Sequence, residues 1–248
     1  MFGDDNELGI PALVAKLPGV LGAVQARAAV VAGELAKHAT IWDDRECFPQ
    51  SSMAALSEAG LLGLTVPKRF GGEGLGVAAA CVALEELATG CLSSAMLAQL
   101  ALNGPPRAID VLGDEEQRAR YLPGVAAGTR SFAIAITEPD AGSDALAMAT
   151  RLEPDGRGFR LHGTKCYITN GANATNVLVF CRLAGTAGPR GIGAVVVDSE
   201  QAGFRPPSTQ PKMGDGGSVR RVWRSTASGW SRAMCSSPPG PTRSTGPA

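Results

Sequence analysis

The spacing of apolar residues changes near residue 131, and this change constrains the fold more than any single motif. Before it, apolar side chains recur at helical intervals, at Leu13, Leu17, Leu21, Val24, Ala28, Val31 and Leu35. After it, residues 132–136 (FAIAI) alternate branched and small side chains with the two-residue period of a strand. A helical block followed by a block of strands predicts an α+β fold of two domains, which disfavours a Rossmann fold.

Residues 1–130 predict an all-α bundle of four or five helices. The segments SSMAALSEAGLLG and VAAACVALEELATG have apolar faces at helical spacing, and Gly60 is expected to end the first helix. In GDEEQRARYLPG, Asp114 is expected to cap the helix and Pro123-Gly124 to end it.

Residues 131–213 predict a second domain made of strands. The stretch LEPDGRGFRLHG predicts a hairpin, because the Asp155-Gly156 pair tolerates the positive φ angles of a tight turn. Further strands are expected at residues 165–168, 177–182 and 192–198.

The formal charge is zero, with 23 basic and 23 acidic residues, but the charges are unevenly distributed. Residues 214–248 hold five Arg and one Asp, which leaves 18 basic and 22 acidic residues in 1–213. The last segment is also rich in Gly, Ser, Pro and Thr, a composition that buries too little apolar surface to offset its ordering entropy. We therefore expect residues 214–248 to be disordered.

Several classes of protein are disfavoured by composition. No basic excess supports binding to nucleic acid, and no stretch has the roughly 18 apolar residues of a membrane span. Six cysteines without a CxxC pair and two histidines argue against a metal site or a disulfide framework. The acidic start, MFGDDNEL, lacks the basic character of a targeting peptide, so a cytoplasmic location is expected.

Gly71-Gly72-Glu73-Gly74-Leu75-Gly76 precedes a predicted helix and superficially resembles a phosphate-binding loop. Its spacing is not GxGxxG, and no βαβ unit surrounds it. The pattern favours a chain reversal that needs small residues.

A second motif, TEPDAGSD at residues 137–144, follows the first predicted strand. Backbone N–H groups and the Ser143 hydroxyl at its tip could hold a phosphate or carbonyl oxygen, or the segment could be an acidic surface turn. Glu138 and Asp140 would repel a pyrophosphate if both pointed inward. The residues alone slightly favour the turn.

A third motif, GTKCYITNG at residues 163–171, could form a flat platform for a ring system, with the Thr169 hydroxyl bonded to a ring nitrogen. Taken alone, it is also typical of a hairpin strand that ends in an Asn-Gly turn.

Together these motifs resemble the acyl-CoA dehydrogenase family. The match follows the family's order through FP before EAGLLGL, then VPKRFGGEGLG, EELATGC, LGDEEQRARYLPGVAAG, AITEPDAGSDA, GTKCYITNGANA and GIGAVVVD. TEPDAGSD followed by KCYITNG is highly specific. The resemblance implies an N-terminal helical domain, an antiparallel, barrel-like middle β domain and a C-terminal four-helix bundle, usually assembled as a dimer or tetramer.

The resemblance also implies FAD as cofactor and acyl-CoA as substrate. Ile134, Ala135, Ile136, Thr137, Gly142 and Ser143 would line FAD, with Ile136 and Thr137 beside the isoalloxazine ring. Ser143 would bond the pyrophosphate and lie near the CoA end of the substrate. Tyr167, Ile168 and Thr169 would pack on the ring, where the family often has Trp or Phe at the position of Tyr167.

The implied reaction is α,β-dehydrogenation of an acyl-CoA to a trans-2-enoyl-CoA, with hydride passing to flavin N5. Electrons would then pass to an electron-transfer flavoprotein or a similar acceptor. A glutamate of the family's C-terminal domain removes the α proton, so no catalytic residue is assigned within these 248 residues. An acyl-CoA oxidase, a flavin monooxygenase of the same fold and a non-catalytic pseudogene product remain alternatives.

The family pattern stops after Lys212-Met213-Gly214, where a segment of the type FDGVxVP would follow. Codons chosen for residues 223–236 and read two bases later encode AFDGVRVVPRNVL. We therefore expect a reading-frame shift near residue 214, loss of the C-terminal bundle and little turnover by the chain as written. The expected organisation is a helical domain at 1–130, an incomplete middle domain at 131–213 and an aberrant tail at 214–248. The nucleotide sequence tests this.

Overall fold

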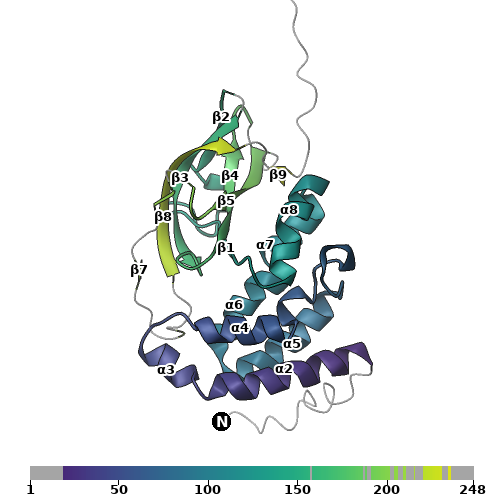
Figure 1. The fold of residues 1–248 in the computed structure, drawn as a ribbon. Coiled ribbons are helices and arrows are strands. Elements are labelled where there is room, and N and C mark those ends of the chain that lie inside the picture. The colour runs from purple at the N-terminus through teal and green to yellow at the C-terminus, as the bar shows by residue number, and fades with distance from the viewer. Residues whose placement is uncertain are drawn as a thin grey trace, which may run out of the picture.

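The computed structural model places a group of helices beside a curved β-sheet (Figure 1). It describes residues 19–156, 158–186, 188, 191–201, 204–205, 209–210, 215, 220–230 and 234–235. Within these ranges the helices precede the strands, as the change of period near residue 131 predicts.

The helical part contains α-helices of 6 to 17 residues. They are α2 (Val20–Ala36), α3 (Ala39–Asp44), α4 (Gln50–Glu58), α5 (Val77–Gly90), α6 (Leu92–Leu102), α7 (Pro105–Leu112) and α8 (Glu115–Ala126), with short 3₁₀ helices η2 (Leu61–Gly63) and η3 (Lys68–Phe70). Helices α6 and α7 were not predicted. Helix α6 is apolar on most sides and has no side-chain cap, whereas α7 is amphipathic and lies between Gly104 and Gly113, so its signal was present in the sequence and was missed.

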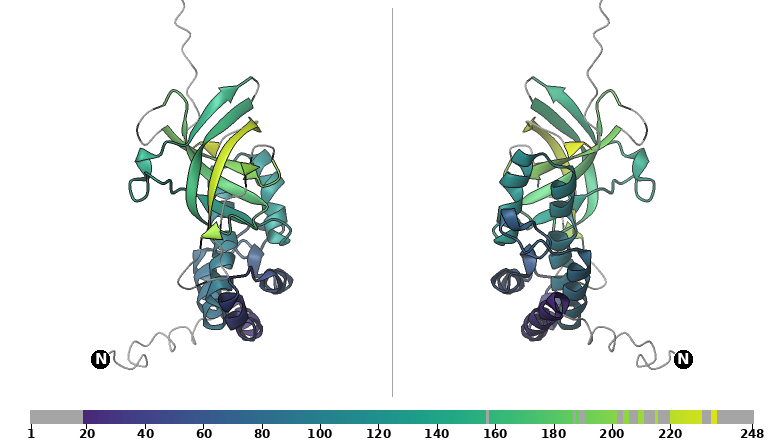
Figure 2. Two further views of the ribbon diagram at one scale, coloured as in Figure 1. Left: turned by 90° about the vertical axis from the view of Figure 1, so that its left-hand side faces the viewer. Right: turned by 90° about the vertical axis from the view of Figure 1, so that its right-hand side faces the viewer.

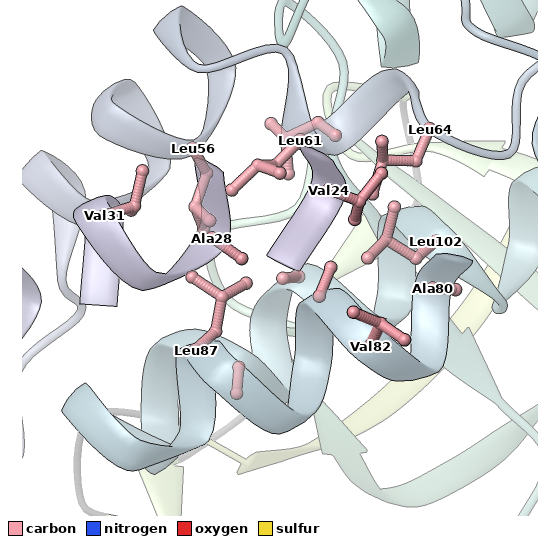
Figure 3. Packing of buried hydrophobic residues seen from close by; sticks show 14 of the residues in the cluster. Val24, Ala28, Val31, Leu56, Leu61, Leu64, Ala80, Val82, Leu87 and Leu102 are labelled. Carbon is pink, nitrogen blue, oxygen red and sulfur yellow. The ribbon is translucent and has the colours of Figure 1, made fainter. Parts of the chain in front are cut away.

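Helices α2 and α5 lie side by side over one apolar core, to which α3, α4, η2 and α6 also contribute (Figure 3). Val24, Ala28, Val31 and Leu35 of α2 are buried, which confirms the predicted face, whereas Leu13 and Leu17 lie outside the described residues. Gly90 permits the close approach, since a Cβ atom there would lie 2.1 Å from the Ala32 carbonyl oxygen.

Two of the three predicted helix ends are confirmed. Gly60 follows α4 with a φ of 67°, and Asp114 forms a capping box with Gln117 at the start of α8. The predicted end at Pro123-Gly124 is wrong, because α8 continues to Ala126. Proline in this last turn forfeits a single intrahelical hydrogen bond, and the chain leaves the helix only at Gly128, whose φ is 68°.

The β part is a single mixed sheet. Its strands are β1 (Phe132–Ala135), β2 (Arg151–Asp155), β3 (Gly158–Thr169), β4 (Asn176–Leu183), β5 (Ile192–Asp198), β6 (Phe204–Arg205), β7 (Thr209–Gln210), β8 (Arg220–Trp230) and β9 (Met234–Cys235). Most pairs are antiparallel, but β1 and β2 each pair with β4 in parallel, so the sheet is not wholly antiparallel as expected.

The predicted hairpin joins β2 to β3 through Gly156, whose φ is 61°. Asn170, with a φ of 61°, makes the expected turn after β3, but this turn does not close a second hairpin. Strand β2 lies between β3 and β4, so the chain must cross it to reach β4. Turn residues determine where a strand ends, whereas the partner of the next strand depends on the whole sheet.

Helices α7 and α8 cover one face of β1, β4 and β5 (Figures 1 and 2). Ile109, Leu122 and Val125 from the helices pack against Phe132 and Leu178 from the strands, and all five side chains are buried. A separate apolar core occupies the inside of the sheet. The helical and β parts are therefore joined by a shared core in addition to the chain at residue 131.

Part of the segment expected to be disordered is a strand. Residues Arg220–Trp230 form β8, which pairs along β3 from Phe159 to Thr169. Backbone pairing to an existing strand edge requires no apolar side chains, which is why composition did not predict it. Most other residues of 214–248 lie outside the described residues. Within the described ranges, no helix has both the length and the apolar character needed to cross a membrane.

Candidate functional site

The loop at residues 137–144 leaves the end of β1 and folds back on itself. The Glu138 and Ala141 backbones exchange hydrogen bonds of 2.9 and 3.3 Å, which makes a tight turn. Beyond the turn, Gly142 and Ser143 are exposed, and a Cβ atom at Gly142 would have no neighbour within 4 Å. The tip therefore presents a hydroxyl group and open backbone to solvent.

Strand β3 runs beside this loop and is interrupted by a bulge. Its register against β8 shifts between Lys165 and Ile168, and Tyr167 within the bulge has a φ of 56°. The Tyr167 side chain is 58% exposed, although both of its neighbours are buried. The Cys166 backbone N–H donates to the Thr137 carbonyl oxygen at 2.9 Å, which brings the loop and the bulge together.

The residues predicted to hold a flavin fall into three groups. Gly142, Ser143 and Tyr167 are exposed, and Ile134, Ile136, Thr137 and Thr169 are half-buried. Ala135 and Ile168 are buried in the core of the sheet, so only their backbone atoms could face a ligand. The backbone hydrogen bond from Cys166 to Thr137 joins the two predicted segments, so that Tyr167 lies one residue away from this bond.

The ion pair that joins the loop at residues 137–144 to strand β3 was not predicted from the sequence. Lys165 and Glu138 form a buried ion pair, with 2.9 Å between Nζ and Oε1. Lys165 Nζ also donates to the Ile136 carbonyl oxygen at 2.7 Å. Glu138 Oε2 accepts from the Ala149 N–H at 2.7 Å, and Oε1 accepts from the Thr150 N–H at 2.9 Å.

This pair removes the electrostatic objection to an anion at the loop. Glu138 points into the protein toward Lys165, while Asp140 is exposed, so the two carboxylates do not converge. A single lysine in a strand is typical of a solvent-facing position, so the sequence held no signal that Lys165 would be buried.

Both members of the pair have shifted pKa values. Burial raises the pKa of Glu138, but hydrogen bonds from Lys165 and from the Ala149 and Thr150 backbones outweigh it, so the pKa lies below its ordinary value. Burial lowers the pKa of Lys165, and the Glu138 carboxylate opposes that effect. Glu138 is therefore an acceptor at neutral pH.

The nearby cysteines are not activated. Burial raises the pKa of Cys181 to about 12 and also raises the pKa of Cys166. A thiol must ionise to act as a nucleophile, so both remain protonated at neutral pH. The chemistry of the site is that of neutral hydroxyl and N–H donors beside an aromatic side chain, which suits a planar ring and a phosphate.

The glycine loop at residues 71–76 differs from this site. Gly71 has a φ of 87°, and a Cβ atom at Gly72 would lie 2.1 Å from the Val66 carbonyl oxygen and 2.6 Å from that of Gly63. The loop packs against its own backbone, which confirms the predicted chain reversal and leaves no room for a ligand at Gly72.

Two family models match the chain in order. The acyl-CoA dehydrogenase N-terminal domain matches residues 23–129, and the acyl-CoA dehydrogenase middle domain matches residues 133–221. A probable acyl-CoA dehydrogenase (fadE25) of Mycobacterium leprae is 36% identical over 185 residues, which are 75% of this chain and 47% of that protein. The chain thus spans about half the length of this relative.

Solved structures agree with the sequence matches. Glutaryl-CoA dehydrogenase from Mycobacterium smegmatis is 28% identical with a TM-score of 0.83, over 96% of this chain and 60% of that one. A chain in the structure of the electron transferring flavoprotein of Acidaminococcus fermentans is also 28% identical with a TM-score of 0.83, over 87% and 57%. The chain therefore belongs to the acyl-CoA dehydrogenase family.

Proposed function

We propose that this chain supplies the flavin-holding surface of an FAD-dependent acyl-CoA dehydrogenase. One observation carries the proposal: the Cys166–Thr137 backbone hydrogen bond joins the start of a loop with an open tip to the bulge that carries the exposed Tyr167 side chain. In a single place the arrangement offers a face for a ring system and donors for a phosphate.

Each predicted residue has a role in this proposal. Tyr167 and the backbone of Ile168 face the isoalloxazine ring, and the Thr169 hydroxyl donates to ring nitrogen N5. Ile134, Ile136, Thr137 and the backbone of Ala135 line the ring from β1. Gly142 and Ser143 hold the pyrophosphate, with Ser143 also near the CoA end of the substrate. The residues fit FAD because the exposed ones among them are neutral and the buried Glu138 carboxylate is already paired, while Asp140 and Asp144, the other acidic residues of the loop, are exposed to solvent.

The proposed reaction is α,β-dehydrogenation of an acyl-CoA. Bound FAD would supply the electron sink, and this chain's residues would orient the ring and exclude water from one of its faces. The α proton requires a carboxylate, which the family resemblance assigns to a helical domain outside residues 23–129 and 133–221. A homo-oligomer and an electron-transferring flavoprotein as acceptor complete the proposal.

Flavin binding tests the first part of the proposal. We expect FAD added to the purified 248-residue chain to bind with quenching of flavin fluorescence. Thr169→Val should weaken that binding about fivefold, the worth of one hydrogen bond. Thr89→Val, at an exposed position on α5, is the matched control and should bind as the wild type does. A wild-type chain that left flavin fluorescence unchanged would contradict the proposal.

Anaerobic mixing with acyl-CoA tests the reaction itself. Because the proton-abstracting carboxylate is assigned outside the two matched ranges, we expect the 248-residue chain with FAD to bleach the flavin only slowly, by a factor of about 10² or more relative to an intact family enzyme. Rapid bleaching would place the base within this chain. Turnover that depends on oxygen would instead favour an acyl-CoA oxidase or a flavin monooxygenase.

A further inference from the structure

The ion pair of Lys165 and Glu138 is unusual among the described ion pairs because both side chains are buried. Lys165 has no exposed surface and Glu138 is 7% exposed, whereas the side chains of the other described pairs are at least 22% exposed. Removing two charges from water is costly, and apolar side chains of similar size often stabilise a fold as well. A contribution to stability alone therefore does not explain the pair.

The hydrogen bonds of the pair connect both ends of one loop. Lys165 Nζ donates to the Ile136 carbonyl oxygen, at the start of the loop. Glu138 accepts from the N–H groups of Ala149 and Thr150, where the loop returns to the sheet. The residues between Glu138 and Ala149, 139–148, include the exposed tip at Gly142 and Ser143. A loop without a core of its own is thus fixed at both ends by two side chains.

Lys165 also lies in strand β3, next to the bulge that carries Tyr167. Lys165 is the last paired residue of β3 before the bulge, and Tyr167 follows it by two positions. In a regular strand residues two apart share a face, but the bulge leaves Lys165 buried and Tyr167 exposed. The Lys165 side chain therefore contacts the loop from inside the protein, while the Tyr167 side chain is exposed to solvent.

We propose that Lys165 and Glu138 are positioning residues that set the distance between the loop tip at Ser143 and the aromatic platform at Tyr167, so that both reach one FAD molecule. This inference rests on the proposed function. The pair does not touch the flavin itself. The pair fixes the loop tip, which would contact the pyrophosphate, relative to Tyr167, which would contact the flavin ring. The loop is then already ordered before FAD binds, so ordering it does not weaken the binding.

A double variant separates positioning from stability. Lys165→Met with Glu138→Gln removes both charges and keeps the side-chain volumes, so no unpaired charge remains in the interior. Met cannot donate to the Ile136 carbonyl oxygen, and a single amide oxygen cannot replace two carboxylate oxygens. We expect the 248-residue double variant to remain folded in equilibrium unfolding, to bind FAD at least tenfold more weakly and to lose the visible circular dichroism of wild-type bound flavin.

Leu56→Ala is the matched control, because Leu56 is fully buried in the helical core and its truncation destabilises the fold without touching the loop. We expect it to bind FAD within twofold of the wild type under conditions where it is folded. Should the double variant fold poorly, Lys165→Met with Glu138→Leu, which leaves neither a charge nor an unpaired side-chain amide in the interior, carries the same expectation for FAD affinity and circular dichroism.

The outcomes distinguish this inference from the proposed function. A wild-type chain that bound no FAD would overturn both. A wild type that bound FAD and a folded double variant that bound it within twofold, with unchanged circular dichroism, would overturn the inference and leave the proposed function intact. Equal losses of affinity in the double variant and in Leu56→Ala would also overturn it, because stability alone would then explain the effect.

Discussion

Two loops of this chain, each with a glutamate and at least one glycine, have opposite structures. Residues 71–76 lie in the helical part and residues 137–144 in the β part. Each carries a glutamate paired with a cation from a distant segment, Glu73 with Arg27 at 2.7 Å and Glu138 with Lys165 at 2.9 Å. The Arg27 and Glu73 side chains are 35% and 37% exposed, whereas the second pair is buried.

The glycines of the two loops also differ in how closely they are packed. At Gly72 the missing side chain lets the backbone pack against the carbonyl groups of Val66 and Gly63. At Gly142 the missing side chain leaves open space. The loop at residues 71–76 packs against neighbouring backbone, and its ion pair is partly exposed. The loop at residues 137–144 has an open tip without such packing, and a buried ion pair fixes its two ends.

The largest difference in stability between the two loops is expected when the cation of each ion pair is removed. Lys165→Met leaves the Glu138 carboxylate buried without its partner, so the free energy of unfolding should fall by about 3 to 5 kcal/mol. Arg27→Met, in the half-exposed pair, should cost about 1 kcal/mol or less. Urea unfolding of both variants checks this, and similar losses would mean that burial does not distinguish the pairs.

The pH dependence of Glu138→Gln should be the next largest effect. Because the folded-state pKa of Glu138 lies below its ordinary value, its contribution to stability is complete above about pH 4.5 and is lost as the pH falls through the folded-state pKa. At pH 7 we expect the variant to be about 3 kcal/mol less stable than the wild type, and the difference should shrink in acid.

The corresponding change in the other loop, Glu73→Gln, serves as the control. Its effect should stay below about 1 kcal/mol at every pH, because that pair is partly solvated. Unfolding curves measured from pH 7 to pH 3 give both series. A constant Glu138→Gln effect across that range would show that the carboxylate charge is not what stabilises the loop.

Adding a methyl group at each glycine should give a smaller contrast. Gly72→Ala places a Cβ atom 2.1 Å from a carbonyl oxygen, and a backbone atom cannot rotate away, so we expect a loss of about 2 kcal/mol. Gly142→Ala should change stability by less than about 0.5 kcal/mol. Thermal unfolding checks both, and a neutral Gly72→Ala would show that the helical loop is less closely packed than described.

The smallest expected effects concern two residues with positive φ, Tyr167 in the β part and Glu46 after α3. Glycine relieves the left-handed conformation but costs more entropy on folding, so Tyr167→Gly and Glu46→Gly should each gain about 0.5 kcal/mol. Only Tyr167→Gly should weaken FAD binding, measured by flavin fluorescence. Equal FAD affinity of the two variants would remove Tyr167 from the proposed site.

Features that depend on neighbours in the sequence were predicted well. The buried face of α2, the Asp114 capping box and the Gly156 turn each rest on residues within a few positions of one another. The end of α8 was predicted wrongly at Pro123, because a proline inside a helix removes its own hydrogen bond without necessarily ending the helix. Leu122 and Val125, on either side of Pro123, are buried against the sheet, and this packing does not depend on the local sequence signal.

Features that depend on distant partners were not predicted. The parallel pairing of β1 with β4 requires knowledge of which strand is the neighbour, and alternation of apolar residues is the same for either direction. The burial of Lys165 requires the carbonyl of Ile136 and the carboxylate of Glu138 to arrive at the same place. A charged residue is buried only where several partners converge, and no local pattern reports that.

The sequence by itself determined the order of helices and strands, the family and the two motifs that form the candidate site. These follow from side-chain periodicity and turn chemistry, which act over a few residues. Only the tertiary structure decided that Tyr167 is exposed while Ile168 is buried, and that Glu138 faces Lys165 rather than a ligand. The physical reason is that burial and ion pairing depend on distances between segments far apart in the sequence, and only the assembled fold fixes those distances.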